Sequence, residues 1–85
     1  MDADVQYARR VTRRALDKSR NPNDESGKIL NRIARSYGED PIREFIRMTV
    51  QKDKPTPKAA TYVFGDGSVG QQLSIAVRQI ENEIG

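Results

Sequence analysis

The strongest constraint on the fold is the stretch from Tyr7 to Arg20, where basic and apolar residues recur with the period of an α-helix. At about 100° per residue, the basic residues fall within one arc of about 140° and the apolar residues fill the complementary arc. The basic arc contains Arg9, Arg10, Arg13 and Arg14, and Lys18 follows at the same spacing. The stretch predicts an amphipathic helix with one cationic face. We expect it to begin after Asp2 or Asp4 and to end near Ser19–Arg20, before the turn residues that follow.

The composition narrows the chemistry that the chain can carry. Its 85 residues predict one small domain, 1–85, and it contains neither cysteine nor histidine. Disulfides and thiolate metal sites are therefore excluded, and the commonest general base and zinc ligand is missing. We expect a protein that is not an enzyme and that has no catalytic residues, no metal and no cofactor. Because only 35% of the residues are hydrophobic, we also expect that self-association or docking onto a partner completes a thin core.

The positive charge is concentrated in the first two thirds of the chain. Up to Lys58 there are 14 Lys and Arg against 9 Asp and Glu, whereas from Ala59 onward there are 1 and 3. A basic surface of this kind favours an anionic partner, either nucleic acid or an acidic protein surface. No apolar run approaches the roughly 20 residues of a membrane helix, and the start, MDADVQ, lacks the apolar segment of a signal peptide. We expect a soluble, cytoplasmic protein without a membrane partner.

Two further helices are predicted after the first. One should run from about Ser26 to Tyr37, capped by Asp24 or Ser26 and ended by Gly38. The next should begin with Asp40 as its N-cap and Pro41 at its first position. Their predicted inner faces contain Ile29, Leu30, Ile33, Ala34, Tyr37, Ile42, Phe45, Ile46 and Thr49, with Met48 and Val50 at the flank. Three short amphipathic helices with tight connections predict a compact bundle over residues 3–50.

The composition of the sequence changes after residue 50. Gln51–Lys58 has three lysines, two prolines and no apolar side chain, which indicates an exposed linker. The linker could also follow a phosphate backbone, but a solvated connector explains it without a partner. Ala59–Phe64 is rich in β-branched and aromatic residues and predicts a strand, followed by a turn at Gly65–Gly67. The expected fold is mainly α with a minor β component (α+β minor).

The last segment has two interpretations. Apolar residues recur at helical spacing, with Ser68 and Gln71 as a capping box and Gly85 just past the end. Leu73, Ile75 and Val77 also alternate, as the return strand of a hairpin would. We favour the helix because the polar, glutamate-rich end suits it better. Residues 59–85 are then a strand–turn–helix unit; with a hairpin, the chain would resemble a winged helix. The helical spacing is carried by Val69, Leu73, Ala76, Val77, Ile80 and Ile84.

Two motifs bear on binding. Ala34 followed by Gly38 fits a helix-turn-helix, in which Arg43, Arg47 and also Gln51 could project from a recognition helix. An ordinary helical hairpin explains the same residues equally well. Residues Gly65–Gly70 have the sequence GDGSVG, which matches the glycine spacing of a dinucleotide-binding loop. The surrounding sequence does not support such a site, because no second strand follows and the Asp66 carboxylate would repel a phosphate. No motif is specific enough to indicate a family.

We therefore hypothesise a small nucleic-acid-binding protein, with DNA favoured and a regulatory role. Its binding residues would be Arg9, Arg10, Arg13, Arg14, Lys18, Arg43 and Arg47. The competing hypothesis is a protein-interaction or assembly module, such as a small inhibitor docking on an acidic partner or an accessory subunit of a larger, for example viral, particle. A solvated helix face without a partner would also explain the basic arc. The choice among these hypotheses depends on whether the basic faces of the helices form one continuous surface.

Overall fold

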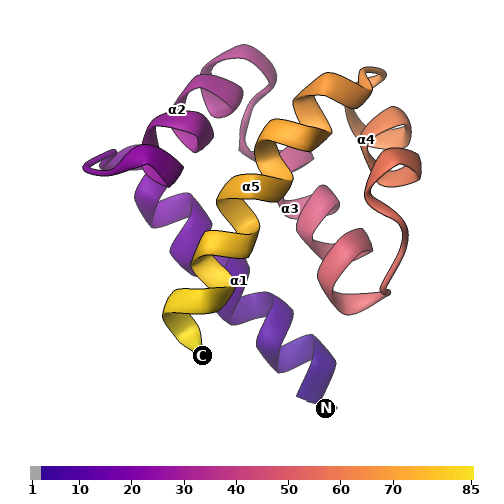
Figure 1. Cartoon of the computed structure of the whole chain (residues 1–85), viewed down its shortest axis with the longest axis horizontal. Coiled ribbons are helices and arrows are strands. Elements are labelled where there is room, and N and C mark those ends of the chain that lie inside the picture. Colours follow the sequence, from indigo (N-terminus) through magenta and orange to yellow (C-terminus); the bar gives the residue numbers. More distant parts are fainter. Residues whose placement is uncertain (1–2) are drawn as a thin grey trace.

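The computed structural model describes residues 3–85, which fold into helices packed around a shared core (Figure 1). No strand occurs among these residues, so the mainly α prediction is confirmed and the predicted β component is wrong. A π-helical turn, η1, continues α3 directly. The elements are α1 (Ala3–Arg20), α2 (Glu25–Tyr37), α3 (Glu39–Ile46), η1 (Arg47–Gln51), α4 (Thr56–Phe64) and α5 (Gly67–Ile84).

The first three helices lie close to their predicted bounds. The side chain of Asp24 caps α2 by accepting a hydrogen bond of 2.8 Å from the Gly27 amide. Gly38 ends α2 at a φ of 91°, which favours glycine. The prediction that Asp40 is the N-cap of α3 is wrong, because α3 begins one residue after Gly38 and has no side-chain cap. The alternative start of α1 at Asp2 lies outside the described residues.

The predicted strand at residues 59–64 is helical. Its β-prone side chains are outweighed by Ala59 and Ala60, which are both fully buried and favour a helix. Pro57 lies in the first turn, where its missing N–H costs no hydrogen bond, and Gly65 ends α4 in the left-handed conformation. The predicted linker 51–58 therefore shortens to residues 52–55, because η1 includes Gln51 and α4 begins at Thr56.

The last segment is the helix α5, so the hairpin alternative is wrong. Leu73 and Val77 are buried, whereas Ile75 between them is 59% exposed, as helical spacing requires and strand alternation does not. The predicted capping box is replaced by Asp66, whose carboxylate accepts a hydrogen bond of 2.9 Å from the Ser68 amide. Gly85 follows the helix as predicted.

The C-terminal helices share one hydrophobic core with the first three. The buried cluster extends from Val11 in α1 to Ile80 in α5, and α5 crosses the bundle diagonally in Figure 1. Gly70 permits a very close approach of α5 to α4, because a Cβ there would lie 2.1 Å from the Cβ of Ala60. No helix in the described part of the chain combines the length and the hydropathy needed to cross a membrane.

Candidate functional site

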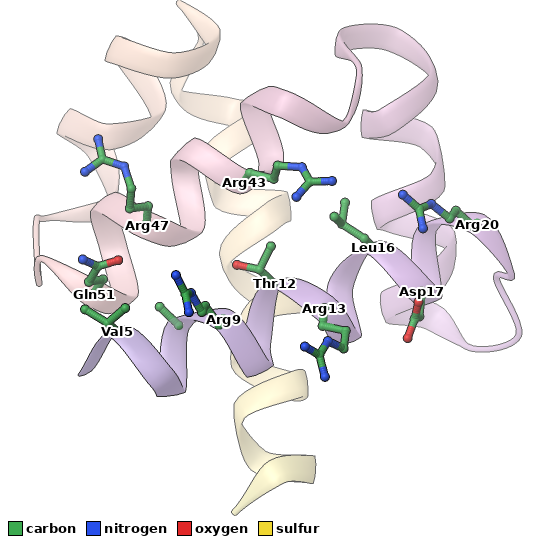
Figure 2. Close-up of a pocket in the computed structure, with 11 residues that line it drawn as sticks. Val5, Arg9, Thr12, Arg13, Leu16, Asp17, Arg20, Arg43, Arg47 and Gln51 are labelled. Atoms are coloured by element: carbon green, nitrogen blue, oxygen red, sulfur yellow. The ribbon is translucent and has the colours of Figure 1, made fainter. Parts of the chain in front are cut away.

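A groove runs between α1 and the continuous α3–η1 segment (Figure 2). We call it the arginine groove, because five arginines contribute to its walls. α1 packs against both α3 and η1, so the outward sides of these helices flank the same depression. The groove is lined by Val5, Ala8, Arg9, Thr12, Arg13, Leu16, Asp17, Arg20, Arg43, Arg47 and Gln51.

Helical spacing on both walls places the cations along the groove. Arg9 and Arg13 are four residues apart on α1, and Arg43 and Arg47 are four apart on the opposite wall. In Figure 2, the side chains of Arg9 and Arg43 point into the gap between the helices, whereas those of Arg13 and Arg47 point outward at its edges. Four of the seven predicted binding residues therefore come together on one surface.

The cations on the α3–η1 wall have carboxylate neighbours within their own helix. Arg43 lies 3.8 Å from Asp40, and Arg47 makes a two-pronged contact with Glu44. Hydrogen bonding from Arg47 holds the pKa of Glu44 below its usual value. Both pairs connect residues three apart on an exposed helix surface, which is a weak and easily exchanged arrangement.

At the other end of the groove, Arg20 is bound across elements. Its guanidinium donates two hydrogen bonds of 2.8 Å to Glu39, the first residue of α3. These bonds hold the pKa of Glu39 below its usual value. Arg13 has no carboxylate within ion-pair distance among residues 3–85, and Asp17 contributes the one carboxylate of the lining. Five arginines and one carboxylate therefore line the groove.

The remaining predicted binding residues of α1 lie on its other side. The basic arc of α1 is about 140° wide, so one edge faces α3 and the other faces α5. Arg10 and Arg14 line a second depression beside Glu83 near the end of α5, and Arg13 and Asp17 line both this depression and the arginine groove. Arg14 lies 3.3 Å from the Glu83 carboxylate. The structure thus separates Arg10, Arg14 and Lys18 from the arginine groove.

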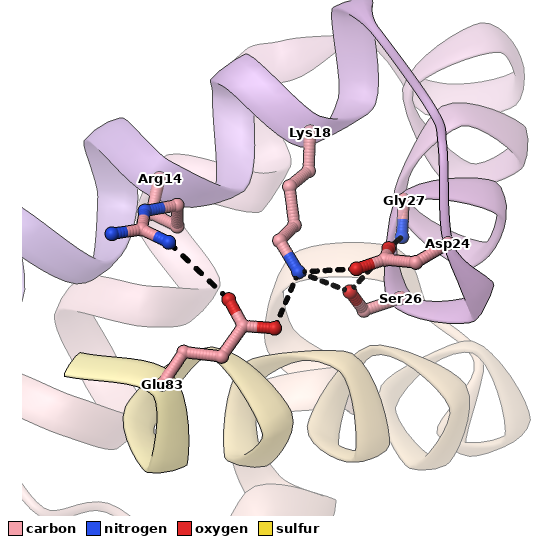
Figure 3. A network of polar contacts seen from close by, with 6 residues as sticks. All are labelled: Arg14, Lys18, Asp24, Ser26, Gly27 and Glu83. Carbon is pink, nitrogen blue, oxygen red and sulfur yellow. Dashed lines mark hydrogen bonds and ion pairs between the residues drawn. The ribbon is translucent and has the colours of Figure 1, made fainter. Parts of the chain in front are cut away.

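Lys18 is the centre of a lysine network that also contains Arg14, Asp24, Ser26 and Glu83 (Figure 3). Its ammonium group donates hydrogen bonds of 2.7 Å to Asp24, 2.8 Å to Ser26 and 2.8 Å to Glu83. The Lys18 side chain is only 10% exposed. Burial would lower its pKa, but the hydrogen bonds to Asp24 and Glu83 raise it on balance.

The same network lowers the pKa of Asp24 to about 2. The largest cause is the hydrogen bond from Lys18, followed by those from the Gly27 amide and the Ser26 hydroxyl. Because it joins the start of α2 to α1 and to the end of α5, the network holds these three helices together. Lys18 therefore has a structural role here, whereas the sequence pattern assigned it to binding.

Seven of the eleven residues that line the arginine groove are outside the predicted binding set. Thr12 is a polar residue within the apolar arc of α1, which is a signal that could have been used. Gln51 was predicted to begin the linker and, in the helix-turn-helix interpretation, to project with Arg43 and Arg47; the π-helical turn places it on the groove wall with Arg47. Val5 and Arg20 lie at opposite ends of α1, and only packing against α3–η1 brings them into the same depression.

Other kinds of site find no support in the described residues. No group of three or more His, Cys, Asp or Glu is placed to hold a metal ion. The GDGSVG stretch forms the corner between α4 and α5, where the Asp66 carboxylate already accepts hydrogen bonds from the amide and hydroxyl of Ser68. The helix-turn-helix interpretation also lacks support. A single residue, Gly38, connects α2 to α3, whereas the turn of that motif has three or four residues.

No family model, curated protein or solved structure matches this chain.

Proposed function

We propose that this protein binds nucleic acid through the arginine groove and acts by binding rather than by catalysis. The observation that supports the proposal is the convergence of Arg9 and Arg13 with Arg43 and Arg47 on one depression. Guanidinium groups present several donors in a fixed plane, which suits phosphate oxygens. From Val5 to Arg20 the wall formed by α1 is about 22 Å long, so a strand lying along it can place several phosphates among these donors.

The weak pairing of the groove arginines fits this role. Asp40 and Glu44 neighbour Arg43 and Arg47 within the same exposed helix surface, and a phosphate can replace or share such a partner at little cost. Asp17 is the main opposing charge in the lining. A binding partner therefore meets two arginines, Arg43 and Arg47, whose ion pairs lie within the continuous α3–η1 segment and do not join it to other elements.

The test is direct binding of labelled DNA, as a duplex and as a single strand, at about 50 mM and about 200 mM salt. If four phosphates are neutralised, this increase in salt should weaken binding about 100-fold. The groove variant carries Arg9, Arg13, Arg43 and Arg47 all changed to Ala, and it should lose both the affinity and the salt dependence. The control variant removes four positive charges elsewhere, at the exposed residues Arg10, Arg32, Arg35 and Arg78. Failure to bind either form, or equal losses in both variants, would contradict the proposal.

Docking onto an acidic protein surface is the competing function, and one observation favours it. The arginine groove contains apolar side chains beside its cations, including the half-buried Val5 and the mostly buried Leu16. A phosphate backbone has no apolar groups to pack against these side chains, whereas an acidic amphipathic segment has both carboxylates and apolar side chains. Poly-glutamate of matched length separates the two functions. If it binds the groove and nucleic acid does not, the protein is an interaction module.

A further inference from the structure

Tyr62 is an exposed aromatic residue without a structural role. It lies on α4 and is 77% exposed. The other aromatic side chains are engaged: Tyr7 donates a hydrogen bond to Glu81, and Tyr37 and Phe45 both pack against Phe64. Among residues 3–85, Tyr62 has neither a hydrogen-bond partner nor an aromatic one. An aromatic ring displayed in this way is available to a ligand.

Cationic residues lie on α4 and on the element packed against it. Lys58 lies one helical turn before Tyr62 on α4, and its side chain is exposed. α4 packs against η1, which carries Arg47, and Lys52 follows η1 directly. Arg47 and Tyr62 are close enough to interact electrostatically. The pKa of Arg47 is raised, first by its hydrogen bond to Glu44 and to a smaller extent by Tyr62. We call Arg47, Lys52, Lys58 and Tyr62 the tyrosine patch.

The tyrosine patch adjoins the arginine groove, because Arg47 belongs to both. In Figure 2 the Arg47 side chain leaves the groove on the side away from α1. A chain of phosphates that leaves the groove past Arg47 therefore meets Lys52, Lys58 and an open aromatic face. Along residues 44–58 the chain carries four cations, Arg47, Lys52, Lys54 and Lys58, against two carboxylates, Glu44 and Asp53.

An aromatic face beside a cationic groove is useful for one form of nucleic acid. Bases in a duplex are stacked on each other and cannot lie flat on a side chain, whereas unpaired bases can. The groove also suits a duplex poorly. Duplex readers insert a protruding helix into the major groove, but here the cationic side of α3, which has only eight residues, is flanked by α1.

We propose that the ligand of the arginine groove is a single-stranded nucleic acid, with one base stacked on Tyr62 and the phosphates beside the groove arginines. This inference rests on the function proposed above and narrows it to unpaired strands. It predicts a preference for single strands over duplexes, with little dependence on base sequence, because every base has a face that can stack.

The experiment compares a labelled oligothymidine of about 15 nucleotides with a duplex of equal length, both at about 50 mM salt. The variants are Tyr62→Ala, Tyr62→Phe and, as a matched control, Ile75→Ala, which trims an exposed apolar side chain on α5. Tyr62→Ala should weaken binding of the single strand about 5- to 100-fold and leave duplex affinity unchanged. Tyr62→Phe keeps the aromatic face and should bind like the wild type, as should Ile75→Ala.

The outcomes separate this inference from the function on which it rests. If Tyr62→Ala binds the single strand like the wild type while the groove variant does not, the stacking inference is wrong and the nucleic-acid function stands. Equal losses on single strand and duplex would also overturn the inference. If the wild type binds neither form, both proposals fall together.

Discussion

The two sides of α1 carry the same kinds of side chain and use them differently. Towards α5, Lys18 is 10% exposed and its ammonium contacts carboxylates from two other elements. Towards α3, Arg9 and Arg13 line an open groove with Arg43, which is 53% exposed and has its carboxylate neighbour one turn away on its own helix. A cation engaged by distant parts of the chain stabilises the fold, whereas a cation with local or no partners remains available to a ligand.

The largest effect should come from two double variants of α1. Arg9→Ala with Arg13→Ala should weaken nucleic-acid binding about 10- to 100-fold, because two charge-assisted contacts are lost. Arg14→Ala with Lys18→Ala removes the same charge and should lower the urea midpoint while the affinity changes little. Fluorescence anisotropy and urea denaturation measure both quantities. An equal loss of affinity in both double variants would mean that the two sides of α1 do not differ in nucleic-acid binding.

Lys18→Met isolates the lysine network. The apolar side chain leaves Asp24, Ser26 and Glu83 without their shared donor, so the free energy of unfolding should fall by about 1–3 kcal/mol. Arg10→Met is the control on the same helix, and it should change the free energy by less than about 0.5 kcal/mol. Similar values for the two variants in urea denaturation would remove the structural role assigned to Lys18.

The pKa of Asp24 makes the network sensitive to acid. The folded-state pKa of about 2 lies below the ordinary value of 3.8. The stabilisation is therefore present above the unfolded value and is lost as the pH falls through the folded value. Asp24→Asn keeps an N-cap but removes the charge. The urea midpoint of the wild type should exceed that of this variant at pH 6 and approach it near pH 2. Glu39, Glu44 and Asp66, whose pKa values are also lowered, titrate in both proteins and cancel. A constant gap across this range would contradict the assignment.

Asp17→Asn should have the smallest effect, and in the opposite direction. It removes the carboxylate of the arginine groove without disturbing the lysine network. One unit charge at about 10 Å in water corresponds to about a twofold change in affinity, so binding of nucleic acid should tighten about twofold at low salt. Unchanged or weaker binding would indicate that the ligand does not pass this end of the groove.

Local sequence signals predicted most of the helices. The 3.6-residue period and the residues Asp24, Gly38 and Gly85 identified α1, α2 and α5 closely. α4 was missed because β-branched and aromatic residues dominate its second half. Its helical state depends on the packing of Ala60 against Gly70, a contact between separate elements that local propensity does not contain.

For the candidate site, the sequence predicted which cations are present, but it did not predict which of them line the arginine groove and which belong to the lysine network. The arc of α1 holds the four predicted arginines, with Lys18 just beyond its edge, and nothing local separates Arg13 from Arg14. The separation arises because Glu83, 69 residues from Arg14, is brought beside one edge of the arc, while α3 lies beside the other. Tyr62 was overlooked for a related reason, since its exposure depends on α4 being a helix.

The most direct test of the division of α1 is an NMR titration of amide and side-chain signals with an oligothymidine of about 15 nucleotides. The account predicts that signals of Arg9, Arg13, Arg43, Arg47 and Gln51 shift progressively, while those of Lys18, Asp24 and Glu83 stay in place. Shifts centred on the lysine network, or spread evenly over every exposed cation, would contradict it.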